Sequence, residues 1–175
     1  MTATGAVILG IFAVVWWIVG MRTAGHSAAV VWVVPVIASV MLGAAVTRLR
    51  GASGPVDDVD EKRRNRLVMM WSAAEGVAIV IAINVLVSVG HRDAFVPVVA
   101  LIVGSHFIPL ARGLPAPTYY VTAAALIAVG LVGFSMPALT ARITLVSAAA
   151  AVILWITAGV VLRRVASSRR TIESA

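Results

Sequence analysis

The sequence predicts an all-α membrane protein: a polytopic bundle of about six transmembrane helices with both ends in the cytoplasm. Three observations predict it, namely the apolar composition, six long apolar runs and an uneven distribution of basic residues. Of the 175 residues, 61% are hydrophobic and 12% are charged, and the mean hydropathy is +1.04. Soluble domains are about 45–50% apolar and about 25% charged. The composition therefore favours a single membrane domain, which we expect to cover residues 1–165.

The first two apolar runs are expected to form a helical pair. Residues 5–21 contain Trp16 and Trp17 near their end. No Lys or Arg precedes this run and further spans follow, so we expect a retained helix rather than a cleaved signal peptide. Residues 28–46 contain Pro35, which a membrane helix tolerates.

The remaining four runs are each bounded by polar or charged residues. A helix needs about 20 apolar residues to cross the hydrocarbon core. Residues 67–89 follow a basic run, and residues 94–110 lie between an aspartate and an arginine. Residues 119–136 open with two tyrosines at the expected aromatic belt, and residues 143–162 lie between arginines.

Basic residues gather on one side of the predicted bundle. With six spans, the two termini and the second and fourth connections share a side, and 11 of the 14 Lys and Arg residues fall there. The positive-inside rule places that side in the cytoplasm, so we expect a multi-pass protein of the plasma or inner membrane. The basic residues behind the net charge of +7 flank the apolar runs, which favours lipid over nucleic acid as the partner of the chain. The residues expected to anchor the bundle are Lys62, Arg63, Arg64, Arg66, Arg163 and Arg164.

Two polar segments complete the chain. Residues 47–66 are expected to form a cytoplasmic loop, and residues 166–175 a cytoplasmic tail. The loop contains an acidic cluster, residues 57–61, which we interpret as part of a solvated loop; binding of a cation or a basic partner is the alternative. Its acids do not follow the spacing of a calcium-binding loop. We therefore predict no metal site and no cofactor.

Glu75 and His106 are the ionisable residues inside the predicted spans, and such groups are functional candidates because burial in lipid is costly. Glu75 lies eight residues after Leu67, about 12 Å from the cytoplasmic end of its helix. His106 lies four residues before Leu110, about 6 Å from that end. Since consecutive helices usually neighbour each other, the two groups can share a proton or line a polar cavity. The alternative is that each serves only helix packing or reaches interfacial water.

Two further residues of the third span are candidates for ligand or proton binding. Trp71 lies one turn before Glu75 on the same helix face and either walls the site or anchors the helix at the interface. Asn84 lies nine residues beyond Glu75, about 180° around the helix. It therefore does not share the face of Glu75, and hydrogen bonding between helices is the alternative role.

One stretch of the sequence resembles a known pattern. The residues His106-Phe107-Ile108-Pro109-Leu110-Ala111, followed by Pro117-Thr118-Tyr119-Tyr120, resemble a pattern in a group of small bacterial six-helix membrane proteins of uncharacterised activity. The resemblance implies that His106 and the cytoplasmic ends of the fourth and fifth helices matter, but it implies no activity. In size and helix count the chain is also similar to the substrate-capturing subunits of vitamin transporters, although none of their motifs is present.

Three functions are compatible with these features. The first is a small-solute transporter or solute-binding membrane subunit that uses Glu75 and His106. The second is an accessory subunit, paired with a second copy or a membrane partner. The third is an enzyme acting on a lipid or isoprenoid with the same two residues as acid and base. The sequence has no phosphate-binding loop, paired-histidine zinc motif or nucleophile elbow, so we assign no catalytic residue and favour transport.

Overall fold

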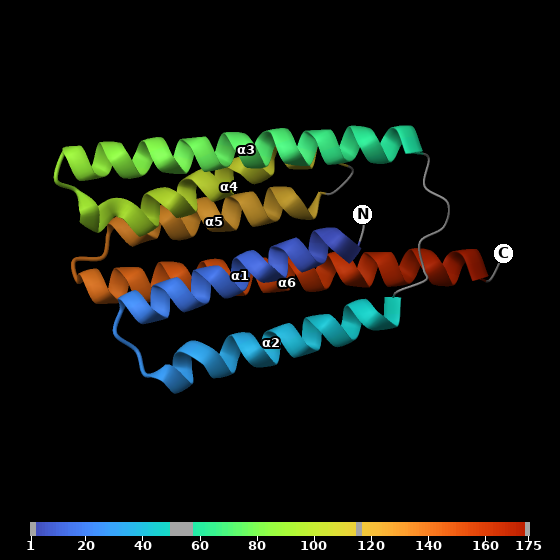
Figure 1. The fold of residues 1–175 in the computed structure, drawn as a ribbon, viewed down its shortest axis with the longest axis horizontal. Helices are drawn as coiled ribbons and strands as arrows, with labels where there is room; N and C mark the ends of the chain where they lie inside the picture. The colour runs from blue at the N-terminus through green and yellow to red at the C-terminus, as the bar shows by residue number, and fades with distance from the viewer. Residues whose placement is uncertain (1–2, 50–57, 115–116, 174–175) are drawn as a thin grey trace.

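The computed structural model describes residues 3–49, 58–114 and 117–173. These residues form six α-helices and one short 3₁₀ helix, η1, between α3 and α4 (Figure 1). In chain order the elements are α1 (Ala3–Thr23), α2 (Ala28–Leu49), α3 (Asp58–Ser88), η1 (Arg92–Ala94), α4 (Phe95–Gly113), α5 (Thr118–Phe134) and α6 (Leu139–Glu173).

The helices have the length and composition of membrane spans. Within the described residues, five of them are long and apolar enough to cross a bilayer. Helix α5 is equally apolar but has 17 residues, about 26 Å of helix, which is at the short end of the range for a span. The prediction of an all-α protein is confirmed, and the long apolar helices are compatible with a multi-pass membrane protein.

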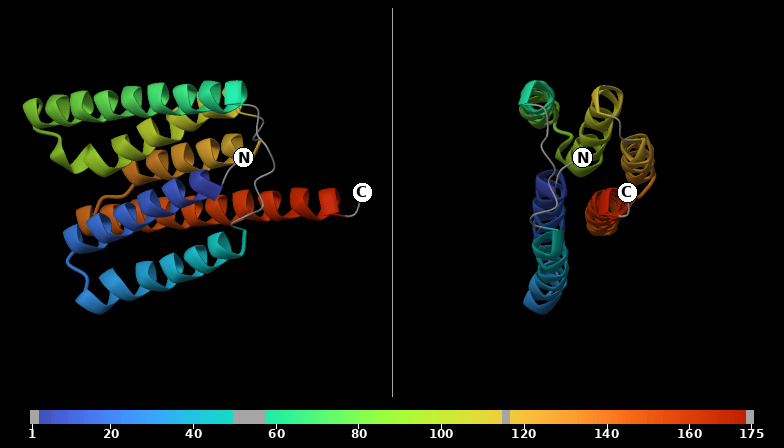
Figure 2. Two further views of the ribbon diagram at one scale, coloured as in Figure 1. Left: turned by 45° about the vertical axis from the view of Figure 1, so that its right-hand side comes forward. Right: turned by 90° about the vertical axis from the view of Figure 1, so that its right-hand side faces the viewer.

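The helices form an open ring. Seen along their axes, α3, α4, α5, α6 and α1 follow one another around the ring, and α2 lies outside against α1 (Figure 2). The most extensive packing joins α1 to α6 and α4 to α5, whereas α3 packs mainly on α4. Both ends of the chain lie at the same end of the bundle, together with the end of α2 and the start of α3 (Figure 1).

Two helices extend into the segment that we predicted to be a loop, residues 47–66. Helix α2 continues to Leu49 and α3 already begins at Asp58, so the basic anchoring residues 62–66 lie on the first turns of α3. The acids at the start of this helix explain the extension, because negative charge is favourable at a helix N-terminus. Residues 50–57 of the predicted loop lie outside the described part of the chain.

The last helix is also longer than predicted. We expected the span to end at residue 162 and a tail to cover residues 166–175, but α6 continues to Glu173. The sequence after Leu162 contains no Pro or Gly and is rich in Arg, Ala and Ser, so no residue there breaks a helix. Residues 174–175 lie outside the described part of the chain.

The buried core lies where α1, α4, α5 and α6 meet. Small side chains of α1 and α6, including Ala13 and Ala150, are fully buried and let these two helices approach closely. Larger side chains such as Phe107, Leu126 and Leu154 fill the space between these helices. The apolar part of α3 buries no residue, so α3 is a peripheral helix whose outer face is exposed.

Two glycines bring α4 and α5 into close contact. A Cβ at Gly104 would lie 3.0 Å from the backbone nitrogen of Ile127 and 3.1 Å from the carbonyl oxygen of Ala123. A Cβ at Gly130 would lie 3.0 Å from the carbonyl oxygen of Pro97. Because these neighbours are backbone atoms that cannot move aside, only glycine allows this approach. The contact fixes α4, and with it His106, relative to the core.

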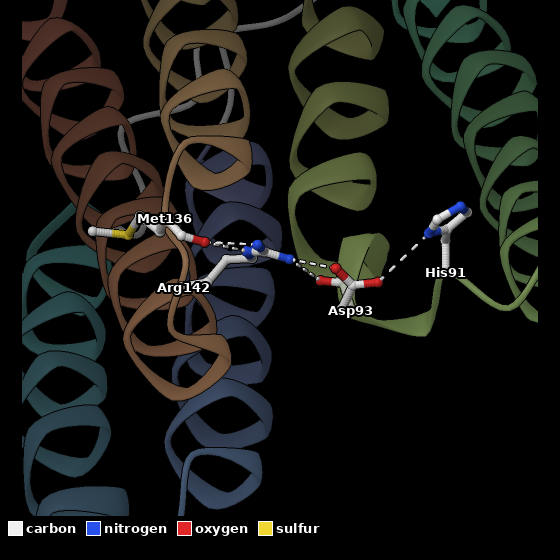
Figure 3. Close-up of polar contacts among 4 residues, drawn as sticks. All are labelled: His91, Asp93, Met136 and Arg142. Atoms are coloured by element: carbon white, nitrogen blue, oxygen red, sulfur yellow. Dashed lines mark hydrogen bonds and ion pairs between the residues drawn. The ribbon is translucent and has the colours of Figure 1, made fainter.

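A polar cluster at the end of the bundle opposite the two termini holds three elements together (Figure 3). The guanidinium of Arg142, on the first turns of α6, donates to the Met136 carbonyl at 2.6 and 3.1 Å. It also donates to the Asp93 carboxylate at 2.8 Å and to the Asp93 carbonyl at 3.0 Å, and His91 lies 4.0 Å from the same carboxylate. Arg142 thereby joins η1, at the start of α4, to the turn between α5 and α6. From the sequence, this arginine counted only as a charge in a loop.

Candidate functional site

A hollow opens inside the ring, on the side where α1 and α3 face each other. It has a volume of about 100 Å³ and is lined by residues of α1, α3, α4, α5 and α6. Most of its walls are apolar, with Phe12 from α1 and Leu154 from α6 among them. The polar side chains that reach it are those of Ser72, Glu75, His106 and Tyr119. We call this hollow the inner cavity.

The Glu75 carboxylate and the His106 ring lie next to each other. The distance from Glu75 Oε2 to His106 Nε2 is 3.7 Å, which is within the range of an ion pair and slightly too long for a hydrogen bond. Both side chains are well shielded, with 10% of Glu75 and 9% of His106 exposed. The sequence predicted similar depths for these residues, and the structure adds that their side chains turn toward each other across the α3–α4 contact.

A backbone carbonyl fixes the orientation of the histidine ring. His106 Nδ1 lies 3.1 Å from the carbonyl oxygen of Trp71. A carbonyl only accepts hydrogen bonds, so Nδ1 carries a proton and donates it. In a neutral ring Nε2 then presents its lone pair to Glu75. The pair can therefore hold one shared proton, either as imidazolium and carboxylate or as imidazole and carboxylic acid.

A second hollow lies on the opposite side of the Glu75–His106 pair. It is a groove of about 840 Å³ between α3 and α4, with Arg63 and Arg112 among its lining residues. We call it the lateral groove. The linings of the inner cavity and the lateral groove have only two residues in common within the described chain, and these are Glu75 and His106. The pair thus contributes to the walls of both hollows.

The structure separates the two other candidate residues. Trp71 belongs to the site: its carbonyl binds His106, and its half-buried side chain lines the lateral groove. Asn84 does not belong to it, because its side chain is exposed and its amide donates to the Val80 carbonyl of the same helix at 2.7 Å. The hydrogen bond of the Asn84 amide therefore lies within α3 and does not link α3 to another helix.

The six basic residues predicted as membrane anchors lie at one end of the bundle, at the start of α3 and near the end of the apolar part of α6. Arg63 lines the lateral groove and is exposed. Lys62 and Arg66 are exposed and lie outside both hollows, whereas Arg64 is half-buried. Arg163 and Arg164 are exposed on α6.

Several residues of the site were not predicted from the sequence. Arg112 was counted only as a loop charge, and Ser72, Ser105 and Tyr119 were not proposed. Helix spacing could have found one of them, since Ser72 lies one turn before Glu75. Tyr119 could be found only from the packing of α5 on α4, where its ring lies 5.5 Å from that of Phe107.

The site has the chemistry of a proton-binding pair. Glu75 and His106 can donate and accept a proton, and no group of three or more metal-ligating residues is found among the described residues. Comparison of the chain with protein-family models, with curated proteins and with solved structures gives no match. The resemblance of residues 106–120 to small bacterial membrane proteins therefore stays a prediction.

Proposed function

We propose that this protein is a multi-pass protein of the cell membrane with both termini in the cytoplasm. The support is the distribution of charge: most Lys and Arg residues belong to the end of the bundle where both termini lie (Figure 1). In this orientation the Arg142 cluster faces the outside, and the basic first turns of α3 face the cytoplasm. The exposed apolar faces of α2 and α3 then contact lipid.

We further propose that the protein binds and moves a small, mostly apolar solute, and that the Glu75–His106 pair couples this movement to a proton. One observation carries the proposal: the pair is the shared wall of the inner cavity and the lateral groove. A solute that passes between the two hollows has to pass the pair. A transporter needs a binding site that opens to one side at a time, and a polar contact that breaks and forms can provide this.

The number of protons on the Glu75–His106 pair sets the strength of the contact between α3 and α4 at this point. With one shared proton, Glu75 and His106 attract each other in either arrangement of that proton. With a second proton the ion pair is lost, and with none the carboxylate faces the lone pair of Nε2. Gain or loss of a proton therefore weakens the contact between α3 and α4 at this point. The other ionisable side chains that line the two hollows are Arg63, Arg112 and Tyr119.

The test is proton-linked flux in proteoliposomes. The purified protein is reconstituted around a pH-sensitive dye, and a panel of small neutral and cationic solutes is added outside. We expect at least one solute to cause proton movement with the wild-type protein. Glu75→Gln keeps the size and polarity of the side chain but cannot ionise, so it should abolish this movement. Asn84→Ala, on the same helix and outside both hollows, is the matched control and should behave as wild type.

The result that contradicts the proposal is equally specific. If Glu75→Gln supports the same flux as wild type, with the same dependence on pH, the pair has no role in coupling. If no solute of the panel moves protons with the wild-type protein, while the protein is folded and correctly inserted, the transport proposal itself is wrong.

A further inference from the structure

The lateral groove has a regular construction. On α3 its lining includes residues 63, 67, 71, 74 and 78, and on α4 residues 101, 105, 108 and 112. Both sets have spacings of three and four, so each forms one continuous helix face. The helices run in opposite directions, and Arg63 at the start of one and Arg112 near the end of the other therefore lie at the same end of the groove.

The two arginines lie about one helical turn apart in depth. A Cβ at Gly113 would be 3.2 Å from a methyl carbon of Leu67, so Arg112 lies near the level of Leu67. Arg63 precedes Leu67 by four residues, about 6 Å along the helix. Both side chains are exposed, and within the part of the chain that the structure describes neither guanidinium has an ion-pair partner.

The rest of the groove is mainly apolar. Away from the arginines, Trp71, Ala78 and Ile102 line it. Its polar side chains there are the exposed Ser105 and the shielded Glu75–His106 pair. The groove is therefore cationic at its membrane-surface end and apolar along its length, with one acid inside. This distribution matches a molecule with an anionic head and a hydrocarbon chain.

We propose that the lateral groove binds one anionic phospholipid from the surrounding bilayer. The phosphate lies between Arg63 and Arg112, where two guanidinium groups can each donate a pair of hydrogen bonds to its oxygens. One acyl chain runs along the groove against Trp71 and Ala78. In the absence of a solute, the chain covers the outer side of the Glu75–His106 pair and separates the pair from the bulk lipid. This site goes beyond the proposed transport function and does not depend on it, because it rests on the arginines and the groove.

The first test measures lipid binding by native mass spectrometry. The purified protein in detergent is titrated with phosphatidylglycerol and, separately, with zwitterionic phosphatidylcholine. We expect one tightly bound phosphatidylglycerol and much weaker phosphatidylcholine binding. The double variant Arg63→Gln/Arg112→Gln should bind phosphatidylglycerol at least about tenfold more weakly, because both charge-assisted contacts to the phosphate are lost. The double variant Arg66→Gln/Arg163→Gln removes the same charge at the same end and should keep wild-type binding.

Two results of this titration would overturn the proposal. An equal loss of binding in both double variants means diffuse attraction by the basic surface rather than a site. Equal binding of the two lipids to the wild-type protein means that the site does not select the net negative charge of the lipid. Added inorganic phosphate in the millimolar range should leave the lipid bound; displacement would mean that the acyl chain adds no affinity, and this too would overturn the proposal that the chain occupies the groove.

A second measurement needs no change to the arginines. Phosphatidylglycerol with brominated acyl chains quenches tryptophan fluorescence on contact, and Trp71 lines the groove. At about one lipid per protein, we expect quenching in the wild-type protein that is lost in Trp71→Phe and kept in Trp32→Phe, since Trp32 is exposed on α2, outside the ring. Quenching that survives in Trp71→Phe would place the lipid elsewhere. Neither lipid measurement needs a solute or a proton gradient, so a failed lipid test and a failed transport test are distinguishable.

Discussion

The side chain of His106 has its two ring nitrogens in different environments. Nδ1 donates to the Trp71 carbonyl, and Nε2 faces the Glu75 carboxylate at 3.7 Å. In a neutral histidine ring, the hydrogen bond of one nitrogen determines whether the other nitrogen carries a proton. Trp71 thus acts through its backbone, and a substitution of its side chain leaves this contact in place.

This geometry predicts the tautomer of His106. In the neutral ring the proton should be on Nδ1, because the Trp71 carbonyl can only accept it. Long-range ¹⁵N–¹H spectra of the protein labelled at its three histidines should show a protonated Nδ1 and an unprotonated Nε2 for one of them. The signal is assigned to His106 by its absence in His106→Gln. A proton on Nε2 in the neutral ring would show that the carbonyl does not orient the ring.

At the scale of elements, the position of α4 depends on backbone contact with α5. Gly104→Ala places a methyl group 3.0 Å from one backbone nitrogen and 3.1 Å from a carbonyl oxygen, and neither can yield. We expect a loss of about 1–3 kcal/mol in the free energy of unfolding, as for other overpacked sites. Gly76→Ala on α3 is the matched control, because nothing lies within 4 Å of its added methyl group. Thermal unfolding in detergent measures both, and an equal Tm for the two variants would contradict the close packing of α4 on α5.

The Arg142 cluster holds η1 against the turn between α5 and α6. Arg142→Gln removes hydrogen bonds to two carbonyls and to the Asp93 carboxylate, so we expect a lower Tm. Asp93→Asn should have a smaller effect, because 52% of that side chain is exposed and the contacts of Arg142 to Met136 remain. Arg92→Gln removes a neighbouring exposed arginine and should leave the Tm unchanged. A larger effect of Asp93→Asn than of Arg142→Gln would mean that the ion pair, rather than the carbonyl contacts, holds these elements together.

For the whole molecule, the decisive property is its orientation in the membrane. The chain contains no cysteine, so single cysteines can report the position of each connection without background labelling. With both termini inside, an impermeant maleimide should label Ser27→Cys and Ser135→Cys in intact cells. It should label Ser167→Cys, on the last turns of α6, only after the membrane is opened. Labelling of Ser167→Cys in intact cells would reverse the proposed topology.

The sequence predicted the helices well and their ends less well. Apolar runs of about 20 residues have no alternative to a helix in a bilayer, so each predicted span corresponds to a helix in the structure. The ends differ most where a helix continues from its apolar run into charged residues, at the start of α3 and the end of α6. There the apolar sequence ends, while the hydrogen bonds of the helical backbone continue. Propensity and terminal charge, rather than hydropathy, decide where such a helix stops.

The sequence by itself determined the all-helical class of this protein, its compatibility with a membrane and the depth of Glu75 and His106, because length and hydropathy along one helix are local properties. The rotation of each helix about its axis is not local: it depends on which faces pack, here through the α4–α5 glycines and the Arg142 cluster. Only the tertiary structure therefore decided that Glu75 and His106 meet, that Asn84 lies apart, and that two arginines from different helices border one groove.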